Sequence, residues 1–190
     1  LDYRNAFELL VATILSAQCT DERVNLTTPE VFRRWPDAPS LAAADLPEIE
    51  ETIRSTGFFR MKAKALSAMS KDLVEKFGGQ PPERLDDLVT LRGVGRKTAN
   101  VVLGNAFGIN EGVVVDTHVG RLSRRLGLTR ELDPVKVEQD LMQAIPKKEW
   151  TLFSHLLIHH GRSDCIARKP KCSLCPLRAQ CPRVGVTVSA

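Results

Sequence analysis

The chain has 190 residues, of which 43% are hydrophobic and 26% are charged, and this length supports a sizeable core in one or two small domains. No apolar run approaches the roughly 20 residues that cross a bilayer, and there is no low-complexity tract and no signal peptide. We therefore expect a cytoplasmic, nucleoid-associated protein. Because the sequence begins with Leu1 rather than Met, we also expect a further segment before it.

The net charge is only +4, but the basic residues are concentrated in two segments. Residues 91–130 carry seven Lys or Arg against two acids, and residues 161–183 carry six against one. Each segment is therefore +5, which leaves −6 for the rest of the chain. Clustered positive charge is typical of proteins that bind a polyanion, because phosphate contacts dominate such binding. We expect a nucleic-acid partner.

The apolar residues follow helical spacing almost throughout, and the first helix to be expected spans residues 7–15. Asp21 is a candidate N-cap for the second helix, and Gly78 with Gly79 should stop a long helix over 61–77. Asp133 and Pro134 should open another helix. The remaining helices are expected over residues 47–54, 85–91, 96–107, 117–126 (ending at Gly127), 134–145 and 149–160 (ending at Gly161).

Only residues 113–115 have an extended pattern, and this segment is too short to build a sheet. The fold class is therefore predicted to be all-α, with no internal repeat. The composition changes near residues 108–113, which places a boundary between a domain over residues 1–112 and a second domain over residues 113–190. Ligand clefts commonly form between domains, so we expect the catalytic groups to meet across this boundary.

The most informative motif is the turn Gly93-Val94-Gly95, which lies between two predicted helices. Glycine adopts backbone angles that other residues avoid, and the N–H groups of such a turn and of the next helix can bind a phosphate. Lys97 follows in the first turn of that helix. The positive end of the helix dipole should favour its neutral, nucleophilic amine.

Asp116 follows Lys97 by nineteen residues, after the β-branched run Val113 to Val115. A phosphate-binding turn, an activated amine and a carboxylate are the groups that covalent chemistry on a nucleic-acid sugar requires. Similar turns between helices also occur in proteins that only hold DNA. The motif alone leaves both functions open.

Four cysteines lie within seventeen residues near the carboxyl end, with the spacing C-x6-C-x2-C-x5-C: Cys165, Cys172, Cys175 and Cys181. The residues between them offer almost no apolar core, so this loop needs a metal centre to order it. Structural zinc and an iron–sulfur cluster both accept four thiolates. Zinc sites usually pair two short C-x2-C motifs, whereas this loop has one, so the spacing favours iron–sulfur. Cys19 lies alone in an apolar run and should be buried.

Together these motifs resemble the endonuclease III family of bifunctional DNA glycosylases, and the likeness extends over essentially the whole chain. It is carried by residues 9–21, 91–100, 115–118 and 159–162 and by the four-cysteine loop, which occur in the family's order. The resemblance implies two helical domains. One is a six-helix barrel with a helix-hairpin-helix at residues 85–108, and the other holds a [4Fe–4S] cluster in the loop 165–181.

The resemblance assigns catalytic roles to two residues. Lys97 would be the nucleophile that attacks the sugar C1′ of a flipped, oxidised pyrimidine nucleotide and forms a Schiff base. β-Elimination would then cut the strand. Asp116 would deprotonate Lys97, stabilise positive charge on the sugar, or do both. Adenine-mispair glycosylases of similar sequence usually carry serine or tyrosine in place of the lysine and leave the strand uncut.

Further positions resemble DNA contacts of the family. Gln18 matches a glutamine that fills the space left by the extruded nucleotide, although a polar helix-end role is an alternative. Gly57-Phe58-Phe59 matches an apolar wedge loop where the family often has Leu-Tyr, although the phenylalanines could belong to the core. The complete set of expected DNA contacts is Gln18, Phe58, Arg92, Gly93, Val94, Gly95, Arg96, Thr98, His118, Arg121, Arg168, Lys169 and Lys171.

The sequence thus predicts a monomeric enzyme that removes oxidised pyrimidines from duplex DNA and cleaves the abasic site. Two other functions are alternatives: a monofunctional mismatch glycosylase and a non-catalytic DNA-binding protein. Lys97 argues against both.

Overall fold

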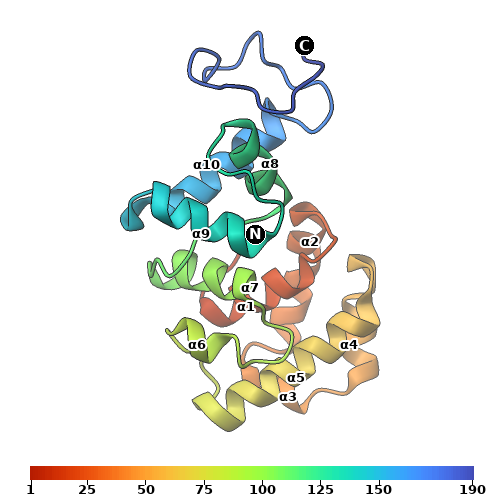
Figure 1. Ribbon diagram of the computed structural model, residues 1–190. Coiled ribbons are helices and arrows are strands. Elements are labelled where there is room, and N and C mark those ends of the chain that lie inside the picture. The colour runs from red at the N-terminus through yellow and green to blue at the C-terminus, as the bar shows by residue number, and fades with distance from the viewer. The chain divides into compact units, whose positions relative to one another are not determined.

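The computed structural model describes residues 1–190, and it consists of helices joined by turns, without any strand (Figure 1). This confirms the all-α prediction. The chain forms two compact units, Leu1–Ile109 and Asn110–Ala190. None of the helices combines the length and the apolar character that crossing a membrane requires.

The first unit is built around a core to which most of its helices contribute. Leu10 and Leu15 from the first helix meet Leu66, Met69 and Leu73 from the longest one, and all five side chains are fully buried. Such burial of large aliphatic side chains is the main force that holds helices together. The helical segments of this unit are α1 (Ala6–Leu15), α2 (Asp21–Arg34), α3 (Ala38–Ala43), α4 (Leu46–Thr52), η1 (Arg54–Thr56), α5 (Phe59–Phe77), α6 (Leu85–Leu88), α7 (Arg96–Val102) and η2 (Leu103–Phe107).

The second unit has a smaller core and a long segment outside it. Its helical segments are α8 (Thr117–Arg125), α9 (Pro134–Ala144), η3 (Lys147–Glu149) and α10 (Trp150–Ser163). Val119 and Leu122 of α8 pack with Leu141 of α9 and with Trp150 and Leu157 of α10. Residues 164–190 contain no helix and run as turns, and the trace in Figure 1 shows them as a loop beyond α10.

Several predicted helix ends are confirmed by their capping contacts. Gly78 ends α5 in the left-handed conformation, with φ of +60°. Asp133 caps α9, since its carboxylate accepts the N–H groups of Val135 and Lys136 at 3.0 and 3.1 Å. The cap of α2 was predicted one residue too late. Thr20 is the cap and accepts the N–H of Arg23 at 3.3 Å, whereas Asp21 is the first helical residue.

Other predicted boundaries are wrong for identifiable reasons. Gly161 does not end α10, which continues to Ser163. A Cβ at this position would lie 2.9 Å from Nδ1 of His118, which is too close. The glycine therefore allows α8 and α10 to pack closely. The helix expected over 85–91 stops at Leu88, and the helix expected over 96–107 becomes a π-helix from Leu103. Helix α3, which begins with a capping box at Asp37, was not predicted.

Candidate DNA-binding and iron–sulfur sites

A buried carboxylate on α5 holds the start of the glycine turn of the first unit. Asp72 of α5 is 3% exposed and accepts three hydrogen bonds from Arg92: from its backbone N at 2.9 Å, from Nε at 3.0 Å and from Nη2 at 3.1 Å. The guanidinium of Arg92, and to a lesser extent Lys76, hold the pKa of Asp72 at about 2, below its usual 3.8. The start of the turn is therefore attached to α5 by a salt bridge.

The residues of the turn itself divide into one buried side chain and two glycines. Val94 is 5% exposed and belongs to the core. Gly93 has φ of +84°, and a Cβ there would lie 3.0 Å from the Cβ of Ala65, so two independent constraints require glycine. Gly95 is the N-cap of α7 and offers no side chain. The turn thus presents backbone at its surface, as the sequence predicted.

Lys97 lies in the first turn of α7, two residues after Gly95, and its side chain is exposed. Arg96 beside it is exposed as well, and Thr98 is half-buried. Neither salt bridge nor hydrogen bond engages the ammonium of Lys97, so the amine is accessible to a ligand at this surface.

Asp116 of the second unit caps α8 through one oxygen of its carboxylate. Oδ1 accepts the N–H groups of His118 and Val119, both at 2.8 Å, which is the usual N-cap geometry. The side chain is half-buried, and its second oxygen takes no part in the cap. One residue can thus begin the helix and still present a carboxylate oxygen for chemistry.

Arg121 and His118, both predicted DNA contacts, lie on α8 and contact α10. Nη2 of Arg121 donates to the carbonyls of Gly161 and Cys165 at 2.9 and 3.0 Å and lies 3.2 Å from Nδ1 of His118. Burial, and next the charge of Arg125, lower the pKa of Arg121. These contacts make Arg121 a brace between the helix and the cysteine loop, a role that the sequence did not suggest.

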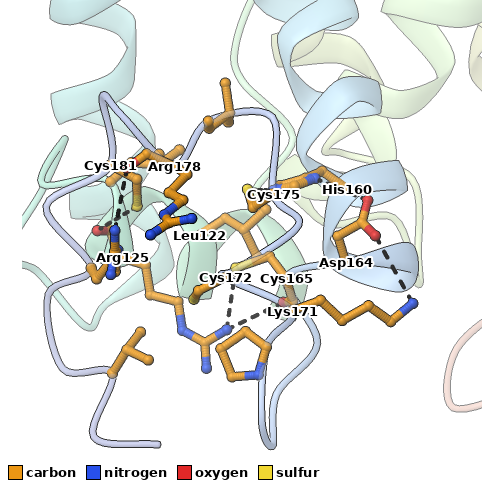
Figure 2. A pocket seen from close by; sticks show the side chains of 15 residues that line it. Leu122, Arg125, His160, Asp164, Cys165, Lys171, Cys172, Cys175, Arg178 and Cys181 are labelled. Carbon is orange, nitrogen blue, oxygen red and sulfur yellow. Dashed lines mark hydrogen bonds and ion pairs between the residues drawn. The ribbon is translucent and has the colours of Figure 1, made fainter. Parts of the chain in front are cut away.

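The four cysteines of the second unit line one open pocket (Figure 2), in which no three of them lie close enough together to share a single metal ion. All four thiols are half-buried, and none is in a disulfide. The loop that carries them has little core of its own, since Leu174, Leu177 and Val184 are exposed. Four free thiols around one pocket, on a loop without a core, fit the donor set of an iron–sulfur cluster.

Two basic side chains reach the sulfurs from the neighbouring helices, as Figure 2 shows. Nη1 of Arg125 lies 3.2 Å from Sγ of Cys165, and the same guanidinium donates to the carbonyls of Ile166 and Ala167. Nε2 of His160 lies 3.5 Å from Sγ of Cys175. Such N–H donors stabilise thiolates, so α8 and α10 supply the surroundings that the cluster needs.

The cationic residues of this loop differ in what they contact. Lys171 lies 3.9 Å from the carboxylate of Asp164, and its backbone N donates to the carbonyl of the same residue. Arg168 and Lys169 are exposed and form no ion pair. Lys169 has φ of +50°, an unusual conformation for a lysine. Strained residues of this kind gather at functional sites.

The two predicted insertion residues of the first unit are also strained and exposed. Gln18 has φ of +52° and Phe58 has φ of +49°, and both side chains are exposed. Phe59, by contrast, packs against the core, with Arg54 and Arg60 over its ring at 5.8 and 5.5 Å. The sequence left the roles of the two phenylalanines open. In the structure Phe58 is exposed and Phe59 packs against the core. Cys19 is half-buried against the core.

Two supporting side chains of these sites, Asp72 and Arg125, were not predicted, and neither was the burial of Lys62. Each is a charged residue within a helical run, where the ordinary expectation is a solvated face. Asp72 and Lys62 are buried in the first unit, and Arg125 reaches a cysteine sulfur. Only the tertiary structure distinguishes them from their exposed neighbours.

Comparison with known proteins gives consistent results for both units. Residues 11–147 match the HhH-GPD superfamily base excision DNA repair proteins, and residues 165–181 match the iron–sulfur binding domain of endonuclease III. The chain is 59% identical to the endonuclease III of Synechocystis sp. over 96% of this chain and 83% of that protein. The match at residues 165–181 confirms the prediction of an iron–sulfur cofactor.

Two solved structures have the same fold. One is a non-covalent endonuclease III–DNA complex, and the other is a trapped endonuclease III–DNA covalent intermediate with an estranged adenine. Both are 44% identical to this chain, with a TM-score of 0.91, and the match covers 96% of this chain and 86% of each of the others.

Proposed function

The chain belongs to the endonuclease III family of base-excision-repair DNA glycosylases, and from this premise we propose that Lys97 forms a Schiff base with the sugar of an oxidised pyrimidine nucleotide in duplex DNA. The same enzyme then cuts the strand at the abasic site. The observation that carries the proposal is the exposed amine of Lys97 directly behind the glycine turn. The trapped covalent intermediate of a 44% identical relative supports it.

The chemistry begins when Nζ of Lys97 attacks the sugar C1′. The bond between C1′ and the base breaks, and the base departs with the bonding electron pair and takes up a proton. The amine loses a proton, the sugar ring opens, and C1′ and Nζ form a protonated Schiff base. Loss of a proton from C2′ then expels the 3′ phosphate, which cuts the strand, and water releases the lysine.

Asp116 supplies the charge and the proton transfer that these steps need. Its Oδ1 is held by two backbone N–H groups, which fixes the carboxylate without burying it. The second oxygen can take a proton from the ammonium of Lys97 or stabilise positive charge on the sugar. The proposal requires that both residues reach the same nucleotide.

DNA binding is assigned to backbone and side chains of both units. The turn Gly93-Val94-Gly95, with Arg96 and Thr98, contacts a phosphate, and His118 lies at the start of α8. Arg92 and Arg121 are largely engaged by protein groups, so we assign them the positioning of these elements. Gln18 and Phe58 enter the duplex beside the flipped nucleotide. Arg168, Lys169 and Lys171 contact the backbone.

Cys165, Cys172, Cys175 and Cys181 would hold the [4Fe–4S] cluster in the pocket that they line. When bound, the cluster would supply metal–thiolate bonds from these four residues, and those bonds would order the loop. We propose that the enzyme acts as a monomer on nucleoid DNA in the cytoplasm; the two basic segments support the binding of DNA.

Borohydride trapping on a duplex with an oxidised pyrimidine tests the proposal. The wild-type protein should form a covalent adduct, and Lys97→Gln should form none while binding DNA nearly as well. Lys64→Gln, at an exposed lysine of α5, is the control and should trap normally. Strand cleavage retained by Lys97→Gln would contradict the mechanism.

Asp116→Asn should lower the rate of base release by roughly 10²- to 10⁴-fold, the usual cost of a missing acid–base group. The amide oxygen still caps α8, so the melting temperature should be nearly unchanged. Single-turnover kinetics measures the rate. An unchanged rate would show that Asp116 only caps the helix.

A further inference from the structure

Lys62 of α5 is a buried lysine that the proposed chemistry does not use. Its side chain is 4% exposed, although lysine is almost never buried without a partner. Nζ donates to the carbonyl of Leu15 and to the carbonyl of Thr56, both at 2.8 Å. Burial lowers the pKa of this ammonium, while the neighbouring Cys19 acts in the opposite direction. Burying an ammonium costs free energy unless hydrogen bonds compensate for the lost water, so the position of Lys62 suggests a specific role.

The two carbonyls belong to the segments that carry the strained, exposed residues. Leu15 is the last residue of α1, and Gln18 follows it in a tight turn that the N–H of Cys19 closes onto the carbonyl of Ser16 at 3.1 Å. Thr56 ends η1, and Phe58 comes two residues later. One ammonium therefore connects the beginnings of both turns.

The two carbonyls lie at helix ends, and this position explains why they favour an ammonium donor. The last carbonyls of a helix have no partner within the helix, and an ammonium is favourable there because this end carries partial negative charge. The backbone N of Lys62 makes the ordinary first-turn hydrogen bond of α5, to the carbonyl of Phe58 at 3.1 Å, which places its side chain beside the Phe58 turn. Lys62 thus contacts both sides of the Phe58 turn and the end of α1.

A separate contact holds η1 against α2 and does not involve the Gln18 turn. The hydroxyls of Thr27 in α2 and Ser55 in η1 lie 3.0 Å apart. This contact is partly exposed, whereas the contacts of Lys62 are buried. The buried ammonium is therefore the candidate for holding the spacing between the turns.

We propose that Lys62 is a positioning residue that couples the Gln18 turn to the Phe58 turn, so that both side chains enter the duplex as one preorganised pair. This rests on the proposed function, in which these two residues occupy the space opened by nucleotide flipping. The coupling replaces two separate ordering steps by one, because each turn already holds its strained conformation before DNA arrives.

A double-mutant cycle tests the coupling. Single-turnover base release is measured for Gln18→Ala, Phe58→Ala and the double variant, first with Lys62 intact and then with Lys62→Met. With Lys62 intact, the loss in the double variant should differ from the product of the single losses by roughly threefold or more. With Lys62→Met, the losses should multiply. Lys64→Met, an exposed lysine of the same helix, should preserve the coupling.

A merely structural role gives a different result. If Lys62→Met lowers the melting temperature but leaves the cycle unchanged, the proposal is overturned. Lys62→Gln is the second variant, because its shorter, uncharged amide reaches one carbonyl at most and still offers a hydrogen-bond donor. It should lose the coupling as well if Lys62→Met does not fold.

Hydrogen exchange separates this proposal from the proposed function. Lys62→Gln should accelerate amide exchange in residues 16–19 and 56–58 together, and Lys64→Met should accelerate neither. This result holds even if the wild-type protein releases no base, which would refute the glycosylase chemistry alone. Acceleration in only one of the two segments would show that Lys62 does not join them.

Discussion

The glycine turn at residues 91–96 and the cysteine loop at residues 165–181 both present basic residues, but different forces order them. The turn rests on a core residue, Val94, and on the buried carboxylate of Asp72. The loop has exposed leucines and four thiols around a pocket. A protein can therefore order a cationic surface either by packing or by a metal centre. We expect the packed turn to be sensitive to acid and the loop to be sensitive to loss of its metal ligands.

Replacing a cysteine of the loop should have the largest effect on this comparison. Cys172→Ser or Cys175→Ser should bleach the yellow-brown colour of the iron–sulfur protein and remove protection from hydrogen exchange in residues 165–181, because no core remains to order them. The turn at 91–96 should keep its protection. Absorbance near 400 nm, roughly where iron–thiolate centres absorb, and iron content are the measurements.

Cys19→Ala is the matched control, since Cys19 lies against the core of the other unit and should leave colour and iron unchanged. A colourless wild-type protein with stoichiometric zinc would contradict the cluster assignment.

Acid should weaken the attachment of the glycine turn to α5. The pKa of Asp72 is about 2 in the folded protein and is ordinarily 3.8, so the charged form is favoured in the native state. Its contribution to stability is present above pH about 4 and is lost as the pH falls toward 2; it amounts to about 2 kcal/mol. The free energy of unfolding should therefore fall over this interval in the wild-type protein.

Asp72→Asn should lower stability at neutral pH and flatten the curve between pH 4 and 2. The exposed salt bridge between Arg33 and Glu30 offers a control, because Glu30→Gln should change the curve little. An Asp72→Asn curve parallel to that of the wild-type protein would show that the salt bridge does not stabilise the turn.

The smallest expected effect concerns single cations of the loop. Lys169→Gln should weaken binding to damaged and undamaged duplexes alike and reduce the slope of log affinity against log salt by about one unit. Lys171→Gln should reduce it less, because Lys171 already lies 3.9 Å from Asp164. An altered lesion preference with an unchanged salt slope would mean that the loop reads the lesion instead of the backbone.

The sequence alone predicted most of the architecture, and its two motifs led to the family, whereas the roles of Lys97 and Asp116 stay predictions. Helical periodicity identified α1, α5, α8 and α9, and the glycine turn and the cysteine spacing needed no tertiary information. The end of α10 could not be predicted, because Gly161 does not stop the helix. It is small because His118 of α8 packs closely against it. Lys62 and Asp72 were missed for a similar reason. A charged residue in a helical run shows its burial only when the helices pack.

Mapping the borohydride adduct tests most directly the claim that Lys97 is the nucleophile. The wild-type protein is trapped on a duplex with an oxidised pyrimidine, digested with protease and nuclease, and sequenced by mass spectrometry. The sugar remnant should be found on the peptide that contains Lys97. An adduct on another lysine or on the terminal amine, with Lys97 unmodified, would contradict the mechanism.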